Sequence, residues 1–319
     1  MSAAAGAWLV AVAGALGLPL GALAVLWIHA LSSGRWGVVL GPALRRLAGL
    51  LPLATLAFLP LLLALPVLMP FVEADPATLP KTVAAKVGYL APGWIVLRTL
   101  LVFAAWLAAW WLTMARAVIP QWLAVVGLCL YPAGLLLFTT DWMLALEPTY
   151  VSTTYPLLVG SAQLLGAFAL AVVLTPASER DGDFGLLLIS AILTWVYLAF
   201  MQWLITFMGN LPWETGWYLR RVDPGGVAVL LASAMLFAVV PFLALLPAAN
   251  RRRPRRLRII AWAIVAGYVA ENLWRLLGAF AQDAALAVAL VLSHAVVAGG
   301  VAWLLRSHAE RWWGVMRHV

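Results

Sequence analysis

Long apolar segments recur from one end of the chain to the other, separated by short polar stretches. There are nine, near residues 7–31, 48–71, 93–115, 120–139, 154–175, 184–209, 226–248, 257–279 and 284–305. A helix of about 20 apolar residues crosses a hydrocarbon core of about 30 Å. The segments are continuously apolar and do not alternate as the strands of a membrane β-barrel do. The pattern therefore predicts an all-α, polytopic membrane helix bundle with about nine transmembrane helices.

Composition agrees with this prediction and limits the domain organisation. Of 319 residues, 65% are hydrophobic and only 10% are charged, with a mean hydropathy of +1.01. A soluble fold of this length could not bury so much apolar surface. No loop reaches the size of an independent domain. Residues 1–319 are thus expected to form a single integral membrane domain, without a soluble catalytic domain.

Basic residues are distributed unequally between alternate loops. With the N-terminus outside, the outward loops hold only Lys81, Lys86, Arg220 and Arg221. The inward loops and tail hold 14 of the 20 basic residues: Arg35, Arg45, Arg46, Arg116, Arg180, Arg251, Arg252, Arg253, Arg255, Arg256, Arg258, Arg306, Arg311 and Arg317. Because basic loops stay in the cytoplasm, this asymmetry predicts an N-out, C-in orientation. The basic run at residues 250–258 is then a topology determinant touching anionic lipid, and not a nucleic-acid site.

Few side chains could hold a redox cofactor. The four histidines are His29, His294, His308 and His318, and only His294 lies deep in a predicted span. A bis-histidine haem needs paired histidines on facing helices, and Cys129 is the sole cysteine. We therefore expect this chain to bind no haem, iron–sulfur cluster or metal of its own.

The eighth predicted span carries the strongest group of intramembrane polar residues. Tyr268, Glu271, Asn272 and Arg275 are spaced to share one helical face. Glu271 and Arg275 can pair at i, i+4, so one interpretation is a self-neutralised structural couple. The other is a proton-carrying carboxylate, since desolvation favours its neutral form. The residues alone do not separate the two.

A second charged group is expected at the outer ends of spans three and four. Arg98 lies a few residues into span three and could pair with Asp141 at the end of span four. Asp141 is followed by Trp142, Glu147 and the hydroxyls of residues 150–155, which together could form a wettable funnel. The alternative is an interfacial belt of aromatic and polar residues.

Span six carries two polar stripes. Ser190, Thr194 and Tyr197 share a face in the inner half, whereas Gln202, Thr206 and Asn210 follow one another at i, i+4 in the outer half. A proton route could change partner helices between the two stripes, with His294 of span nine as a relay. Bonds between neighbouring helices are the structural alternative.

Three segments resemble a known family. They are Thr140–Tyr155 (TDWMLALEPTYVSTTY), Met208–Arg221 (MGNLPWETGWYLRR) and His29–Gly37 (HALSSGRWG), and together they resemble the F subunit of bacterial alternative complex III. That family belongs with the polysulfide-reductase-type (NrfD-type) membrane subunits. By residue match the resemblance carries over Asp141, Glu147, Tyr155, Asn210 and Glu214, whereas Glu271, Arg275 and His294 rest on the argument from polarity alone.

The resemblance implies a fold, a complex and a location. Family members contain two four-helix bundles without haem, and F-type subunits have ten helices with both termini inside, so nine spans beginning one helix later agree with N-out. The complex is a quinol:electron-acceptor oxidoreductase of the bacterial cytoplasmic membrane. Its partners would be a sister membrane subunit, an iron–sulfur subunit and a multihaem cytochrome c that carry the haem c and iron–sulfur clusters, with a terminal oxidase as a further associate. The F-type subunit would offer a proton route or quinone-adjacent support, and a quinone pocket is compatible with the family.

Two other classes stay open. A purely structural scaffold subunit would need none of the charged residues to titrate. A secondary transporter would show related halves with helices interrupted at corresponding positions, and no convincing internal repeat is present.

Overall fold

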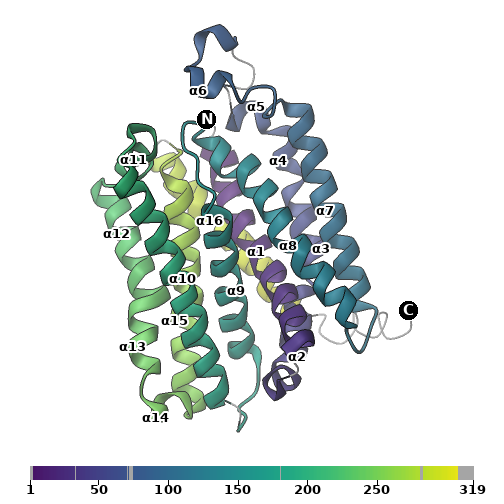
Figure 1. The fold of residues 1–319 in the computed structure, drawn as a ribbon. Helices are drawn as coiled ribbons and strands as arrows, with labels where there is room; N and C mark the ends of the chain where they lie inside the picture. The colour runs from purple at the N-terminus through teal and green to yellow at the C-terminus, as the bar shows by residue number, and fades with distance from the viewer. Residues whose placement is uncertain are drawn as a thin grey trace.

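A computed structural model describes residues 3–32, 34–69, 71, 75–179, 181–280 and 283–307. The predicted tail residues His308, Arg311, Arg317 and His318, and Arg180, lie outside these ranges. The described chain is helical and contains no strand (Figure 1). Its helices confirm the nine predicted spans, at Ala3–Ser32, Arg35–Leu63, Pro92–Met114, Gln121–Leu146, Tyr155–Leu174, Asp181–Gly209, Pro224–Leu245, Pro254–Leu277 and Ala284–Leu305.

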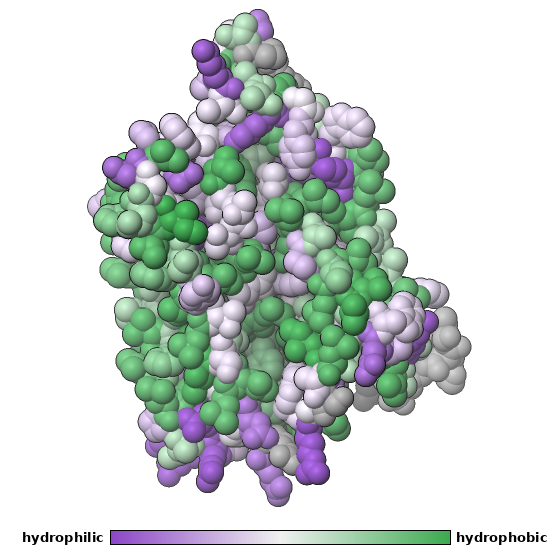
Figure 2. All heavy atoms as spheres, viewed as in Figure 1, coloured by the Kyte–Doolittle hydropathy of each residue, from purple (hydrophilic) through white to green (hydrophobic). Residues whose placement is uncertain are grey.

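The spans run side by side and create two distinct ends. One end holds the start of the chain, α6 (Lys81–Ala84) and α11 (Pro212–Leu219), and the other holds α14 (Ala248–Arg251) (Figure 1). We call these the α11 end and the α14 end. Figure 2 shows a wide band of hydrophobic residues with hydrophilic residues gathered at both ends. This surface is what a multi-pass membrane protein requires, since lipid cannot solvate charged groups.

Helix α1 (Ala3–Ser32) lies at the centre of the bundle. It packs against α8 (Gln121–Trp142), α9 (Tyr155–Leu174) and α16 (Ala284–Ser307). Small residues on α1 permit this approach, because a Cβ at Gly17 would overlap the hydroxyl of Tyr268 and the side chain of Gln163. The hydroxyl of Tyr268 donates to the carbonyl of Gly14 at 2.9 Å, which ties α15 to α1.

The remaining spans pack around this centre in two groups. On one side α7 (Pro92–Met114) packs against α8 and α3 (Leu51–Phe58). On the other side α9 packs against α10 (Asp181–Gly209) and α15 (Pro254–Leu277), and α15 packs against α12 (Pro224–Ser233).

The second span is not the single helix that the apolar run at 48–71 suggests. It begins with α2 (Arg35–Ala48), whose polar and apolar residues fall on opposite faces, and continues as α3 and α4 (Pro60–Leu63); the short helix α5 (Leu65–Leu68) follows it. Pro60 and Pro66 begin new helical turns because proline lacks the N–H that a continuous helix needs. Proline therefore breaks a segment that hydropathy alone presents as uniform.

The seventh span contains a π-helical turn, Ala234–Val239, between α12 and α13 (Val240–Leu245). Pro241 follows this turn and cannot donate to the carbonyl four residues earlier, which relaxes the preceding turn into a wider helix. Gly267 of α15 lies against the backbone of Phe237 in the widened turn. The irregularity directly follows Ser233, a residue of the candidate site.

Candidate functional site at the α11 end of the bundle

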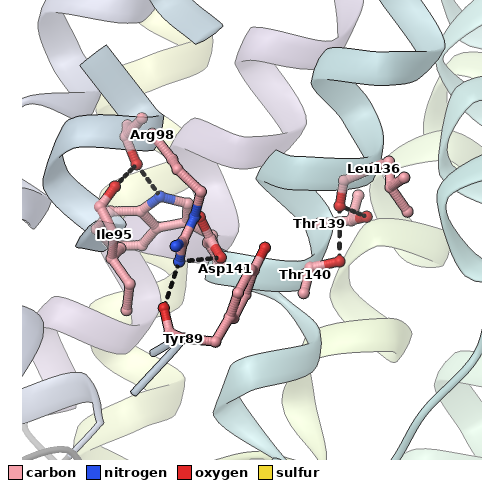
Figure 3. A network of polar contacts seen from close by, with 9 residues as sticks. Tyr89, Ile95, Arg98, Leu136, Thr139, Thr140 and Asp141 are labelled. Atoms are coloured by element: carbon pink, nitrogen blue, oxygen red, sulfur yellow. Dashed lines mark hydrogen bonds and ion pairs between the residues drawn. The ribbon is translucent and has the colours of Figure 1, made fainter. Parts of the chain in front are cut away.

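Asp141 and Arg98 form a bidentate ion pair between α8 and α7 (Figure 3). Arg98 Nε donates to Asp141 Oδ2 at 2.8 Å, and Arg98 Nη2 donates to Asp141 Oδ1 at 2.9 Å. Nη2 also donates to the carbonyl of Tyr89 at 2.9 Å, and the Tyr89 ring lies 3.9 Å from the guanidinium carbon. The contact between Arg98 and Asp141 that sequence spacing suggested is thus present, with the fork geometry that gives the strongest arginine–carboxylate bonds.

Neighbouring bonds hold this pair in place. The indole N–H of Trp142 donates to Thr99 Oγ1 at 2.9 Å, and Thr99 in turn donates to the carbonyl of Ile95 at 2.7 Å. Trp142 and Thr99 are both buried. Helices α7 and α8 are therefore fastened twice at this end, once by charge and once by neutral hydrogen bonds. Burial, followed by the charge of Asp141, raises the pKa of Tyr89 above its ordinary value.

A pocket of about 200 Å³ lies beside this pair. Its walls are Lys86, Tyr89, Leu90, Leu136, Thr140, Leu144, Ala145, Pro148, Tyr150, Val151, Ser152 and Thr153. Lys86 Nζ donates to the carbonyl of Pro148 at 2.6 Å, and burial lowers the pKa of Lys86. Of the residues predicted to form a wettable funnel, Tyr150, Ser152 and Thr153 line this pocket, and Asp141 does not. Two residues assigned to the funnel by sequence, Trp142 and Glu147, are instead engaged in buried hydrogen bonds and ion pairs.

Glu147 is clamped by two arginines from the loop after α11. Arg220 Nε donates to Glu147 Oε1 at 2.6 Å, and Arg221 contacts both carboxylate oxygens. Only 2% of the Arg221 side chain is exposed, against 43% for Arg220. The two segments that carry the family resemblance, Thr140–Tyr155 and Met208–Arg221, are joined through this carboxylate.

Arg221 is the residue that sequence reasoning missed, because charge counting placed it in an outward loop. Besides Glu147, it donates to the carbonyls of Trp217 at 2.6 Å, Trp274 at 3.2 Å and Arg275 at 2.7 Å. Its guanidinium carbon lies 3.7 Å from the Trp217 ring centroid. One buried guanidinium thus caps the end of α15 and anchors α11. The available signal was an arginine pair one residue after the aromatic pair Trp217 and Tyr218.

Glu271 and Arg275 form a looser pair inside α15. Arg275 Nε lies 3.6 Å from Glu271 Oε1, and the side chains are 2% and 3% exposed. Ser233 of α12 donates to Glu271 Oε2 at 2.8 Å. The polar face of α15 is therefore divided between two neighbours, because Tyr268 and Asn272 bond α1 whereas Glu271 bonds α12.

Aromatic rings pack beside these ion pairs. Trp217 stacks on Tyr150 at 5.0 Å between centroids and meets Trp274 edge-on at 5.5 Å. Tyr155, only 1% exposed, and Tyr218 also contact Trp217 edge-on. Burial raises the pKa of Tyr150 to about 12, although its neighbours Ser152 and Thr206 act in the opposite direction. At neutral pH this hydroxyl is therefore a hydrogen-bond donor.

The outer stripe of α10 divides into buried and exposed residues. Gln202 and Thr206 are buried, and Thr206 Oγ1 donates to the carbonyl of Gln202 at 3.1 Å. Asn210 is exposed and adopts a positive φ of 45° directly after α10, a conformation that asparagine tolerates well. Glu214 is half-buried in the first turn of α11, where the helix dipole favours a carboxylate. Asn210 and Glu214 thus shape the turn between α10 and α11.

The inner stripe does not continue this polar group. Ser190, Thr194 and Tyr197 are exposed on the surface of α10, and the first two hydroxyls bond carbonyls of their own helix. The predicted route that switches partner helices halfway is therefore wrong for these residues. Hydroxyls can satisfy themselves within one helix, so polarity at a fixed spacing does not reveal which way a stripe faces.

His294 also lies apart from the site. Its Nδ1 lies 2.8 Å from the carbonyl of Leu290 in its own helix, and the adjacent Val291 and Leu292 are 69% and 60% exposed. The structure therefore gives the predicted relay histidine a local bond and no described bond to the Glu271 group.

A polar contact near the centre of the bundle was not anticipated. The hydroxyl of Tyr131 in α8 donates to Gln163 Oε1 in α9 at 2.9 Å and to the carbonyl of Gly160 at 3.2 Å. A single glutamine within an apolar helix was the available signal. The contact ties the two groups of helices together beside the Tyr268–Gly14 bond.

Comparison with protein-family profiles finds no match, and comparison with curated proteins finds no significant similarity.

Proposed function

We propose that this chain is a non-haem integral membrane subunit of a quinol-oxidising respiratory complex, a quinol:cytochrome c or other quinol:electron-acceptor oxidoreductase of the bacterial cytoplasmic membrane. The observation that carries this proposal is the meeting of the two motif segments. In the two segments that resemble the F-type subunit, Glu147 of the first and Arg220 and Arg221 of the second form one ion-pair group around the buried Glu147 carboxylate. Motifs that are distant in sequence and adjacent in space are expected when both serve one function.

The architecture supports the proposal in two ways. Helices α3, α7 and α8 pack on one side of the central α1, and α9, α10, α12 and α15 pack on the other, a division into two groups that suits the two bundles of the resembled family. The arginine-rich loop at residues 250–258 lies at the α14 end. We therefore propose that the α14 end faces the cytoplasm and the α11 end faces outward.

The polar groups suit a proton route or quinone-adjacent support. Asp141 and Glu271 are buried carboxylates at the proposed outward side, and intramembrane ionisable groups commonly mark such sites. The pocket beside Asp141 has mostly apolar walls with Thr140, Ser152 and Thr153 among its polar groups. Such walls suit an amphipathic molecule such as a quinol.

Purification from native membranes tests the assignment. The tagged chain is expected to bring down a multihaem cytochrome c, an iron–sulfur subunit and a sister membrane subunit, identified by mass spectrometry and by the haem spectrum. The double variant Glu147→Gln, Arg221→Met removes the ion pair between the two motif segments. It should reduce the yield of this assembly. Purification of the wild-type chain alone, or with a stoichiometric haem on this chain itself, would refute the assignment.

A structural scaffold is the second candidate, and one observation favours it. Asp141, Glu147 and Glu271 each pair with arginine, so all three could serve folding alone. Proton movement coupled to quinol oxidation distinguishes the roles in membranes carrying Glu271→Gln or Asp141→Asn. Reduced coupling with normal complex yield supports the proton route, whereas wild-type coupling in both variants supports the scaffold.

A further inference from the structure

Four buried side chains around Trp217 have polar atoms without a protein hydrogen-bond partner. They are Nε and Nη1 of Arg275, Oε1 of Gln202, Nε1 of Trp274 and the hydroxyl of Tyr150, which lies near Ser152 and Thr206 without hydrogen-bond geometry to either. None of these side chains is more than 9% exposed. A buried polar atom without a partner costs about 1–3 kcal/mol, and a charged one costs more. Satisfying these atoms would therefore stabilise the fold considerably.

These atoms belong to one neighbourhood. The Trp217 ring stacks on Tyr150 and makes a T-shaped contact with Trp274. Gln202 lies beside the Tyr218 hydroxyl, and Tyr218 is close enough to Tyr150 and to Glu271 to be affected by both. Nε1 of Trp106 is also buried without a partner, but it is a single indole donor beside the apolar rings of Phe103 and Phe138.

The chemistry of the four groups identifies the ligand. Arg275 and Trp274 can only donate, the Gln202 oxygen can only accept, and a tyrosine hydroxyl can do both. The ligand must therefore both accept and donate. Neighbouring charges disfavour an anion, because Arg221, Arg220 and Arg275 already face Glu147 and Glu271, with Glu214 close to Tyr150. Water meets these requirements, and a buried water molecule typically makes about three hydrogen bonds.

We propose that Arg275, Gln202, Tyr150 and Trp274 enclose a cluster of internal water molecules that joins the Glu271 carboxylate to the pocket at the α11 end. Tyr150 connects the water cluster to the pocket, because its side chain both lines the pocket and stacks on Trp217. The hydration itself rests only on this geometry. The role of the water cluster as an access path for protons to Glu271 rests on the proposed function.

Hydroxyl-radical footprinting of the purified full-length chain in lipid nanodiscs tests the water cluster. Radicals generated from bound water oxidise the aromatic side chains next to it. Trp217 and Trp274, 2% and 9% exposed, should be oxidised several-fold faster than the dry controls Trp106 and Trp142, which are 1% and 0% exposed. Equal oxidation rates in all four tryptophans would overturn the proposal.

Two variants sharpen the result. Gln202→Leu removes, at similar volume, the one group of the four whose unpartnered atom can only accept, and it should lower the oxidation of Trp217 and Trp274 toward the level of Trp106. If Gln202→Leu fails to fold, Tyr150→Phe replaces it as the test. This variant keeps the stacked ring and should also lower the oxidation of Trp217 and Trp274. Unchanged oxidation in a folded Tyr150→Phe chain would show that water reaches these tryptophans without the proposed cluster. Because the isolated chain is used, this outcome is separate from whether the chain assembles with redox partners.

Discussion

The Asp141–Arg98 pair and the Glu271–Arg275 pair have the same chemistry and different geometry. The first has two short hydrogen bonds in fork geometry, a further bond to a backbone carbonyl and an aromatic ring against the guanidinium. The second is a 3.6 Å contact within one helix, and Nε and Nη1 of Arg275 make no hydrogen bond to the protein. The satisfied pair joins two helices, whereas the unsatisfied pair lies among groups that can bind water.

The difference has a geometric cause. Residues on two facing helices can approach in any orientation that packing allows, so Arg98 reaches Asp141 side-on. An i, i+4 pair has its backbone separation fixed, and Glu271 is also drawn toward Ser233 on α12. Burial alone therefore does not reveal whether a charged pair is structural, and the number of bonds at each nitrogen is more informative.

Loss of Arg98 should give the largest effect. Arg98→Ala leaves the Asp141 carboxylate buried without its partner, and breaking such a pair costs about 3–5 kcal/mol in the free energy of unfolding. Unfolding of the purified protein in detergent measures this change. The double variant Arg98→Ala, Asp141→Asn is the control and should recover part of the loss. A single variant as stable as the wild type would remove the structural role assigned to this pair.

The second-largest effect should be a loss of folding stability at alkaline pH, caused by the deprotonation of Tyr150. Its pKa is about 12 in the folded chain, against about 10 for an exposed tyrosine. The folded state thus holds this proton more tightly, so the associated stability is complete below pH ~10 and lost as pH rises toward ~12. The loss is about 2–3 kcal/mol at 1.36 kcal/mol per pKa unit. Tyr150→Phe should lack this component of the decline, and identical pH profiles of the two proteins would contradict the assignment.

Coupling between Glu271 and Arg275 should be the smallest effect. A double-mutant cycle with Glu271→Gln and Arg275→Met is expected to give a coupling energy of about 1 kcal/mol, because the contact is long and Ser233 still holds the carboxyl group. The same cycle on Asp141 and Arg98 should give a clearly larger value. Equal coupling energies in the two cycles would remove the distinction between the pairs.

Much of the fold could be predicted from the apolar pattern, and less of the site. Continuous apolar runs specify helices because no other structure satisfies the backbone in lipid, and nine helices are found in the described chain near the predicted positions. The breaks at Pro60 and at the turn before Pro241 were missed, since hydropathy does not register a missing N–H. Arg98 with Asp141 was predictable because both lie near the same end of adjacent spans.

The sequence by itself determined that this is a multi-pass helical protein and which polar residues lie within its apolar helices. Only the tertiary structure decided which of those residues meet. Arg221 was predicted to be a loop charge and is buried among three segments. Ser190 and Thr194 were predicted to belong to a proton route and are exposed on the surface. The physical reason is that lipid makes apolarity necessary over each whole span, a local condition visible in sequence. The direction of a polar side chain depends instead on helix rotation and neighbours, which packing sets.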